Sequence, residues 1–136
     1  METKKRFNPQ QLFLIDGFGA LLSAFLLGIV LVQMEDFFGI PEQALYALAI
    51  LPCFFALYDF YCYRYIRKNQ ALFLTIIALV NLVYCVFSLG MAFYHSAVIS
   101  FYGWGYVIGE VMLILMLVIL EFKMAKRLRH ENKNSD

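Results

Sequence analysis

Four long apolar stretches dominate this chain and restrict what it can fold into. They cover about residues 12–33, 44–63, 71–94 and 103–122. Each approaches the roughly 20 apolar residues that a helix needs to cross a hydrocarbon layer about 30 Å thick. The short connections between them place consecutive helices side by side and antiparallel. The sequence therefore predicts an all-α integral membrane protein, with residues 1–136 forming one domain, an up-down-up-down bundle of four transmembrane helices.

The composition agrees with this prediction. Of the 136 residues, 62% are hydrophobic and 15% are charged, which is too apolar for a soluble domain of that size. The first stretch follows Lys4, Lys5 and Arg6, as a secretory signal would. Its apolar run is longer than the roughly 7 to 15 residues of a signal core, and no small-x-small cleavage site precedes Glu35. We therefore interpret it as a retained transmembrane helix and exclude a soluble catalytic domain.

The basic residues predict the orientation of the bundle. All 11 Lys and Arg residues fall in residues 4–6, 64–68 and 123–133, whereas the connections 35–43 and 95–102 contain neither type. By the positive-inside bias we expect both termini in the cytoplasm, with residues 123–136 as a basic cytoplasmic tail. The brevity of the chain and its lack of a targeting sequence favour a bacterial inner (plasma) membrane. Because topology accounts for every basic residue, we expect no binding to nucleic acid.

Carboxyl groups within the first two spans are expected to meet. Asp16 and Asp59 each lie about 8 Å from the cytoplasmic ends of their helices, on neighbouring helices. Asp59 shares its helix face with Tyr63, and two carboxyls at this depth would share a proton or pair with a base such as Arg64. Asp16 should face protein, because it begins a row of small residues of the kind through which membrane helices approach one another: Ala20, Ala24 and Gly28.

The third and fourth spans contribute a second polar group. Glu110 in the fourth span lies level with Tyr84 in the third, so we expect a hydrogen bond between them. We assign no function to Glu121, which lies at the interfacial end of the fourth span among basic residues. The candidate intramembrane network comprises Asp16, Asp59, Tyr63, Asn81, Tyr84, Ser88, Tyr106 and Glu110. Such a set is either a proton or ion relay or a group of interhelical hydrogen bonds that fixes the packing of the bundle.

Two glycines in the fourth span form a helix-packing motif. Gly105 and Gly109 are four residues apart, a spacing that lets another backbone approach closely. We expect this face to pack inside the monomer, with a dimer interface as the alternative.

The sequence contains no signature of catalysis, so we do not expect an enzyme. It lacks a Gly-rich phosphate loop, H-E-x-x-H and G-x-S-x-G, and its Cys and His residues are not spaced as ligands, so we expect no metal and no cofactor. The sequence alone favours a non-enzymatic accessory or interaction protein that packs in the lipid bilayer against a membrane protein partner or a second copy of itself. The alternative is a small proton-linked transporter or channel that uses the intramembrane carboxylates.

Overall fold

The computed structural model describes the backbone of residues 8–135 and the side chains of residues 8–131. Lys4, Lys5 and Arg6 lie outside this range. All of the regular structure in the described part is helical, in the order α1 (Pro9–Phe25), η1 (Leu26–Val30), α2 (Leu31–Gln33), α3 (Glu35–Phe38), α4 (Glu42–Tyr65), α5 (Gln70–Tyr94) and α6 (Phe101–Ser135). The π turn η1 joins α1 to α2, so residues 9–33 form one long helix.

Four helical segments are long and apolar enough to cross a membrane, as the sequence predicts: Pro9–Gln33, Glu42–Tyr65, Gln70–Tyr94 and Phe101–Glu131. Helix α6 continues past residue 122 to Ser135, so the backbone of the predicted basic tail is helical as far as that residue. The added residues include Lys, Met, Ala, Arg and Leu and contain no Gly or Pro, which favours continuation of the helix.

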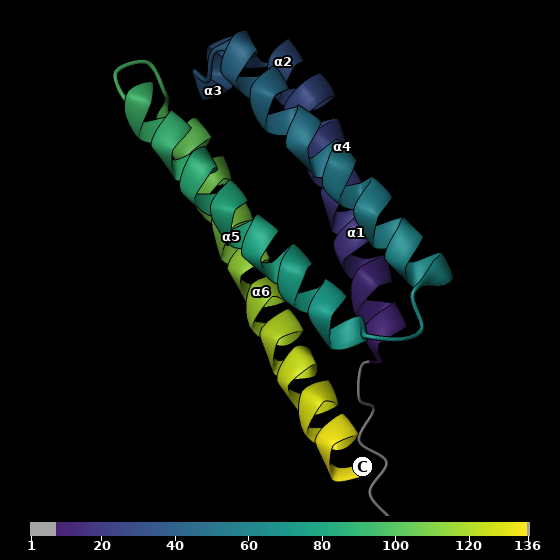
Figure 1. Ribbon diagram of the computed structural model, residues 1–136. Coiled ribbons are helices and arrows are strands. Elements are labelled where there is room, and N and C mark those ends of the chain that lie inside the picture. Colours follow the sequence, from purple (N-terminus) through teal and green to yellow (C-terminus); the bar gives the residue numbers. More distant parts are fainter. Residues whose placement is uncertain (1–7, 136) are drawn as a thin grey trace, which may run out of the picture.

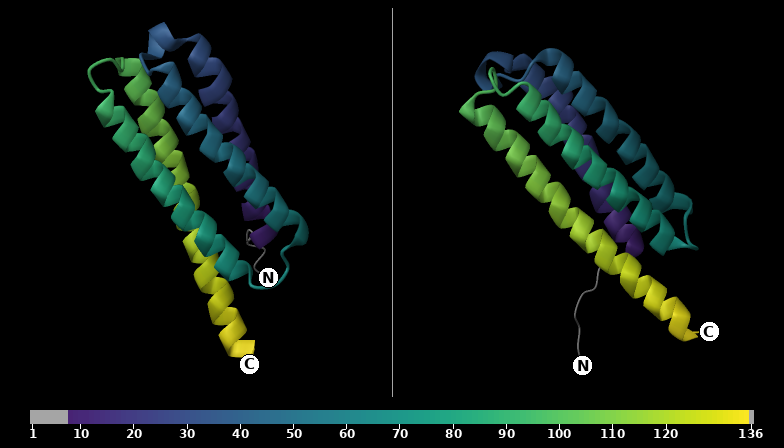
Figure 2. Two further views of the ribbon diagram at one scale, coloured as in Figure 1. Left: turned by 45° about the horizontal axis from the view of Figure 1, so that its top comes forward. Right: turned by 60° about the vertical axis from the view of Figure 1, so that its left-hand side comes forward.

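The long helices form two antiparallel pairs. α1 packs along α4 and α5 packs along α6, whereas contacts between the pairs are much sparser; Figure 1 shows the two pairs. In Figure 2 the start of α1 and the end of α6 lie at the same end of the bundle. We call this the basic end, because Arg64, Arg67 and Lys68 lie there. The opposite end, with Glu35 and Glu42, is called the acidic end.

The two pairs are tied together at both ends. At the acidic end, the Ser100 hydroxyl donates to the carbonyl oxygens of Phe37 (2.7 Å) and Phe38 (2.9 Å). Gly39 nearby has φ +76°, and a Cβ there would collide with backbone atoms of residues 98–100, so only glycine fits. At the basic end, the Tyr58 hydroxyl of α4 donates to the carbonyl oxygen of Phe73 in α5 (2.9 Å).

Two apolar clusters fill the interior, and polar residues lie between them. The cluster toward the acidic end includes Leu27, Leu45 and Val107, and the one toward the basic end includes Phe13 and Leu74. On each of the four long helices, one buried polar residue lies in sequence between the residues that belong to the two clusters. These residues are Asp16, Asp59, Asn81 and Glu121.

Candidate functional site

Helix α1 carries Asp16 into the interior. The helix begins with a capping box, in which the Asn8 side chain accepts from the Gln11 backbone N–H while the Gln11 side chain accepts from the Asn8 N–H, and Pro9 fits the first helical position. Leu12 and Asp16 are four residues apart, which places them on one face. Both are buried there, Asp16 with 4% of its surface exposed.

Gly17 allows Asp16 and Asp59 to meet. A Cβ at Gly17 would lie 3.0 Å from the Phe60 ring and 3.2 Å from Cβ of Asp59, so α1 and α4 approach closely at this level because residue 17 has no side chain. Asp59 is completely buried, and its carboxyl lies within hydrogen-bonding reach of the carboxyl of Asp16. The predicted proximity of these two carboxyls is confirmed.

Asn81 of α5 and Glu121 of α6 complete this group, which we call the acidic cluster. The Asn81 Nδ2 group donates to Oδ1 and Oδ2 of Asp16 at 3.3 and 3.4 Å, and to Oε1 of Glu121 at 3.4 Å. All three distances are long for N–H···O bonds. The acidic cluster therefore joins one side chain from each of the four long helices, and Asn81 is its only hydrogen-bonded amide donor among the described residues.

The acidic cluster contains no base. An ion pair joins Arg127 and Glu131 at 3.5 Å, and neither residue belongs to the cluster. The expected alternative, pairing with Arg64, is wrong, because that residue is exposed and its guanidinium lies 6.0 Å from the ring of Tyr65. No donor in residues 8–131 reaches either carboxyl oxygen of Asp59. Adjacent carboxylates without a cation cannot all be ionised, so the acidic cluster favours the protonated form of at least one of its carboxyls.

Glu121 is the site residue that the sequence analysis missed. It is completely buried, although its position next to Lys123 indicated a place at the membrane surface. A usable signal was its spacing from Val118 and Ala125, three and four residues away on the same helix face. Both of those residues are buried as well.

A second polar group lies nearer the acidic end and is centred on Glu110. The Tyr84 hydroxyl lies 3.4 Å from Oε2 of Glu110 and 3.3 Å from the carbonyl oxygen of Leu48, which confirms the predicted contact between Tyr84 and Glu110. Leu48 lies four residues before Pro52, which has no N–H to donate to that carbonyl. The Tyr84 hydroxyl lies where the missing helix hydrogen bond would be and has one O–H to share between this carbonyl and Glu110; neighbouring helices compensate for prolines in membrane proteins in this way.

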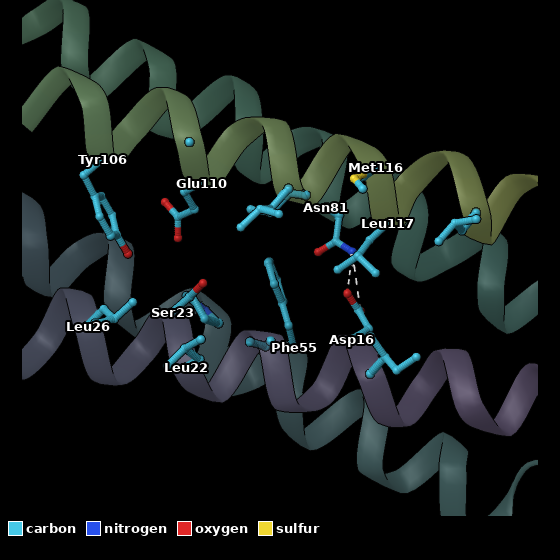
Figure 3. A pocket seen from close by; sticks show the side chains of 18 residues that line it. Asp16, Leu22, Ser23, Leu26, Phe55, Asn81, Tyr106, Glu110, Met116 and Leu117 are labelled. Atoms are coloured by element: carbon cyan, nitrogen blue, oxygen red, sulfur yellow. Dashed lines mark hydrogen bonds between the residues drawn. The ribbon is translucent and has the colours of Figure 1, made fainter. Parts of the chain in front are cut away.

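A cavity of about 490 Å³ connects the two polar groups. It lies between α1 and α6, and Phe55 of α4 contributes to its inner wall. In Figure 3, Tyr106 and Glu110 line one part of the cavity opposite Ser23, and Asp16 and Asn81 line the other. The remaining lining side chains are almost all apolar.

Two residues of the predicted network do not join either polar group. Tyr63 is 39% exposed, so its predicted place beside Asp59 is wrong. The buried line on α4 passes through Ala56, Asp59 and Cys62, and residue 63 is rotated away from it. Ser88 is buried on α5, but its hydroxyl has no hydrogen-bond partner among residues 8–131.

The small residues predicted to pack behave differently on the two helices. Ala20 and Ala24 are half-buried, and a Cβ at Gly28 would lie 3.3 Å from Cβ of Ala49 on α4, so the row on α1 does approach another helix. A Cβ at Gly105 or Gly109 would meet no described atom within 4 Å. The predicted packing of this glycine pair inside the monomer is therefore wrong, and Gly109 instead lines the cavity.

Comparison with known proteins gives no relative for this arrangement: no family model, no curated protein and no solved structure matches the chain. Among the described residues, no group of three or more His, Cys, Asp or Glu side chains could hold a metal ion.

Proposed function

We propose that this protein is a small proton-linked transporter in the inner membrane of a bacterium. Its four long helices span the bilayer and its basic end faces the cytoplasm, so that both termini lie on that side. The absence of Lys and Arg from residues 35–43 and 95–102 supports this orientation.

The observation that carries the proposal is the convergence of three buried carboxyls without a base. Asp16, Asp59 and Glu121 come from three different helices and lie at most 4% exposed. Ionisable groups inside a membrane are expensive and characteristically serve proton or ion pathways. A shared proton between Asp16 and Asp59 makes the acidic cluster a site that can take up and release protons.

A purely structural role explains the acidic cluster less well. Interhelical hydrogen bonds would hold the helices together, but the three bonds from Asn81 are long and Asp59 accepts no N–H in the described part of the chain. Replacing a buried ion pair by apolar residues of similar volume is often neutral or stabilising by about 1–4 kcal/mol, and these carboxyls lack even the attraction of such a pair. An accessory protein would gain nothing from keeping this arrangement.

The interior favours a transporter over an open channel. Between the acidic cluster and the basic end, the apolar cluster around Leu12, Phe13, Leu74 and Met124 fills the bundle. Tyr58 packs against this layer, but its hydroxyl donates to the carbonyl oxygen of Phe73. We therefore infer that a proton bound at Asp59 reaches the cytoplasmic side when the helices move. The sparse contacts between the two helix pairs are where such movement costs least.

Proton flux in proteoliposomes tests the proposal. A pH-sensitive dye in the lumen would report flux driven by a potassium diffusion potential, for the wild type beside Asp59→Asn, Asp16→Asn and Glu42→Gln. Glu42 is an exposed carboxyl at the acidic end and serves as a charge-matched control. We expect flux in the wild type and in Glu42→Gln, and loss of flux in both aspartate variants.

Flux equal to that of protein-free liposomes, or flux that survives both aspartate substitutions, would refute the proposal. The accessory role favoured by the sequence alone would then be the better interpretation, and the search would turn to proteins that co-purify with the chain.

A further inference from the structure

The cavity between α1 and α6 is open on one side to the surroundings of the bundle. Leu22 of α1, and Leu113 and Met116 of α6, line the cavity and are 58%, 66% and 58% exposed. With the long helices spanning a bilayer, this opening lies among lipid chains. A molecule could therefore enter the cavity sideways from the membrane without crossing either aqueous surface.

An unpartnered carboxylate oxygen points into this cavity. Glu110 is only 8% exposed and lines the cavity, as Figure 3 shows. Its Oε2 faces the Tyr84 hydroxyl, and the Ser23 hydroxyl lies opposite the carboxyl across the cavity. No hydrogen bond of good geometry reaches Oε1 from residues 8–131. A buried acceptor without a donor is costly, so a ligand that brings an N–H group to Oε1 would bind favourably.

The cavity walls also determine the charge and shape of the ligand. Asp16 and Glu110 are the ionisable carboxyls of the lining, which contains no Lys, Arg or His. The walls are otherwise mostly aliphatic, with the aromatic rings of Phe55 and Tyr106, which attract organic cations. The volume of about 490 Å³ is that of a site for a small organic molecule.

We propose that this cavity binds an organic amine with an apolar or aromatic body, which enters from the bilayer and donates its ammonium N–H to Oε1 of Glu110. This inference rests on the proposed function in treating the amine as the transported substrate, whereas the binding site itself does not depend on proton transport. A phospholipid ammonium is disfavoured as the occupant, because it would bring its phosphate to a depth where no lining residue is basic.

Energy transfer from the single tryptophan to a dansyl amine tests the inference. Trp104 is the only Trp of the chain and lies about 9 Å along α6 from Glu110. The probe is dansylcadaverine, which has an aromatic body and a primary ammonium. The protein would be held in phosphatidylcholine liposomes, whose lipid headgroup contains no primary amine, without a pH gradient. The neutral N-acetyl derivative reports simple partition into the lipid.

Two pairs of variants separate ligand binding from damage to the fold. Glu110→Gln removes the carboxylate, with Glu42→Gln as its control. Gly109→Leu fills the cavity, and Gly105→Leu is its control, because a Cβ at either glycine meets open space but only Gly109 lines the cavity. Circular dichroism and gel filtration of each variant check that it is folded.

We expect saturable transfer with dansylcadaverine but not with its acetylated form. Loss of a hydrogen bond to a charged group should weaken binding about tenfold or more in Glu110→Gln, and Gly109→Leu should do the same, while both controls bind as the wild type does. Added phosphatidylethanolamine should not compete. If it does compete, a lipid ammonium is the occupant and the inference is wrong.

Transfer that is unsaturable, or that survives both Glu110→Gln and Gly109→Leu, would also overturn the inference. Proton flux without saturable transfer would refute the amine and leave the proposed function standing. Saturable transfer without flux would support the amine site and refute the proposed function.

Discussion

Replacing Asp59 by Asn should stabilise the folded protein, and the gain should grow with pH. In the wild type no N–H of the described residues reaches the carboxyl of Asp59, and its neighbour within reach is the carboxyl of Asp16. An asparagine of nearly the same size can donate its amide N–H to Asp16. A hydrogen bond to a charged group contributes about 1.5–3 kcal/mol. We therefore expect the free energy of unfolding to rise by that amount at pH values where one carboxyl of the wild-type pair is ionised.

The pH dependence follows from the shared proton. Above about pH 4 an unfolded aspartate has lost its proton, whereas the folded acidic cluster still holds one. The folded state then binds more protons than the unfolded state, so the free energy of unfolding of the wild type falls as pH rises, by about 1.4 kcal/mol per pH unit for one proton. Asp59→Asn removes one partner of the shared proton, so its free energy of unfolding should fall less steeply.

Thermal unfolding in detergent, measured at several pH values, would check both points. Asp36→Asn is the control, because Asp36 is exposed at the acidic end and its substitution should leave both stability and pH slope unchanged. If Asp59→Asn is less stable than the wild type by the same amount at every pH, Asp59 holds the bundle together as a structural group. Asp59 would then not share a proton with Asp16 in the folded protein.

Two further substitutions test how the helices are held together. Tyr84→Phe should lower the free energy of unfolding by about 1–3 kcal/mol, because it leaves a buried carbonyl beside a proline without a donor. Tyr94→Phe is the control and should change this free energy little, because Tyr94 is 82% exposed. Chemical denaturation would show the difference between the two variants. Gly17→Ala should lower the free energy of unfolding by about 1–3 kcal/mol, because its Cβ forces α1 away from α4. Gly19→Ala is the control, because its Cβ meets nothing within 4 Å. Equal effects of the two substitutions in thermal unfolding would contradict this packing of α1 on α4.

The sequence predicted the four long helices and two of the polar contacts because these depend on spacing along single helices. Asp16 and Asp59 could be matched in depth by counting residues, and so could Tyr84 and Glu110. Depth does not determine rotation, which is why Tyr63 was wrongly placed inside. The buried line of α4 follows Asp59 to Cys62, and a shift of one residue on a helix turns a side chain by about 100°.

The missed features depend on which helices pair, and a single sequence does not determine that. Glu121 is buried because α6 packs along α5 and extends past the predicted end of its span, so the helix face with Val118 and Ala125 stays covered. Gly109 was expected to bring a helix close, but α1 is held against α4 through Gly17 instead. The space left opposite Gly109 is the cavity.

The acidic cluster and the cavity are not independent, because Asp16 and Asn81 belong to both. A positive charge placed in the cavity favours the ionised form of a nearby carboxyl. The carboxyl of Asp59 does not line the cavity. A charge in the cavity therefore acts on the proton shared by the two aspartates through Asp16. An ammonium that enters from the bilayer would therefore weaken the hold of the acidic cluster on its proton, and a proton that returns would weaken the hold of the cavity on the ammonium. This reciprocity couples the two sites through the shared position of Asp16, and it leaves proton movement possible when no ammonium is bound.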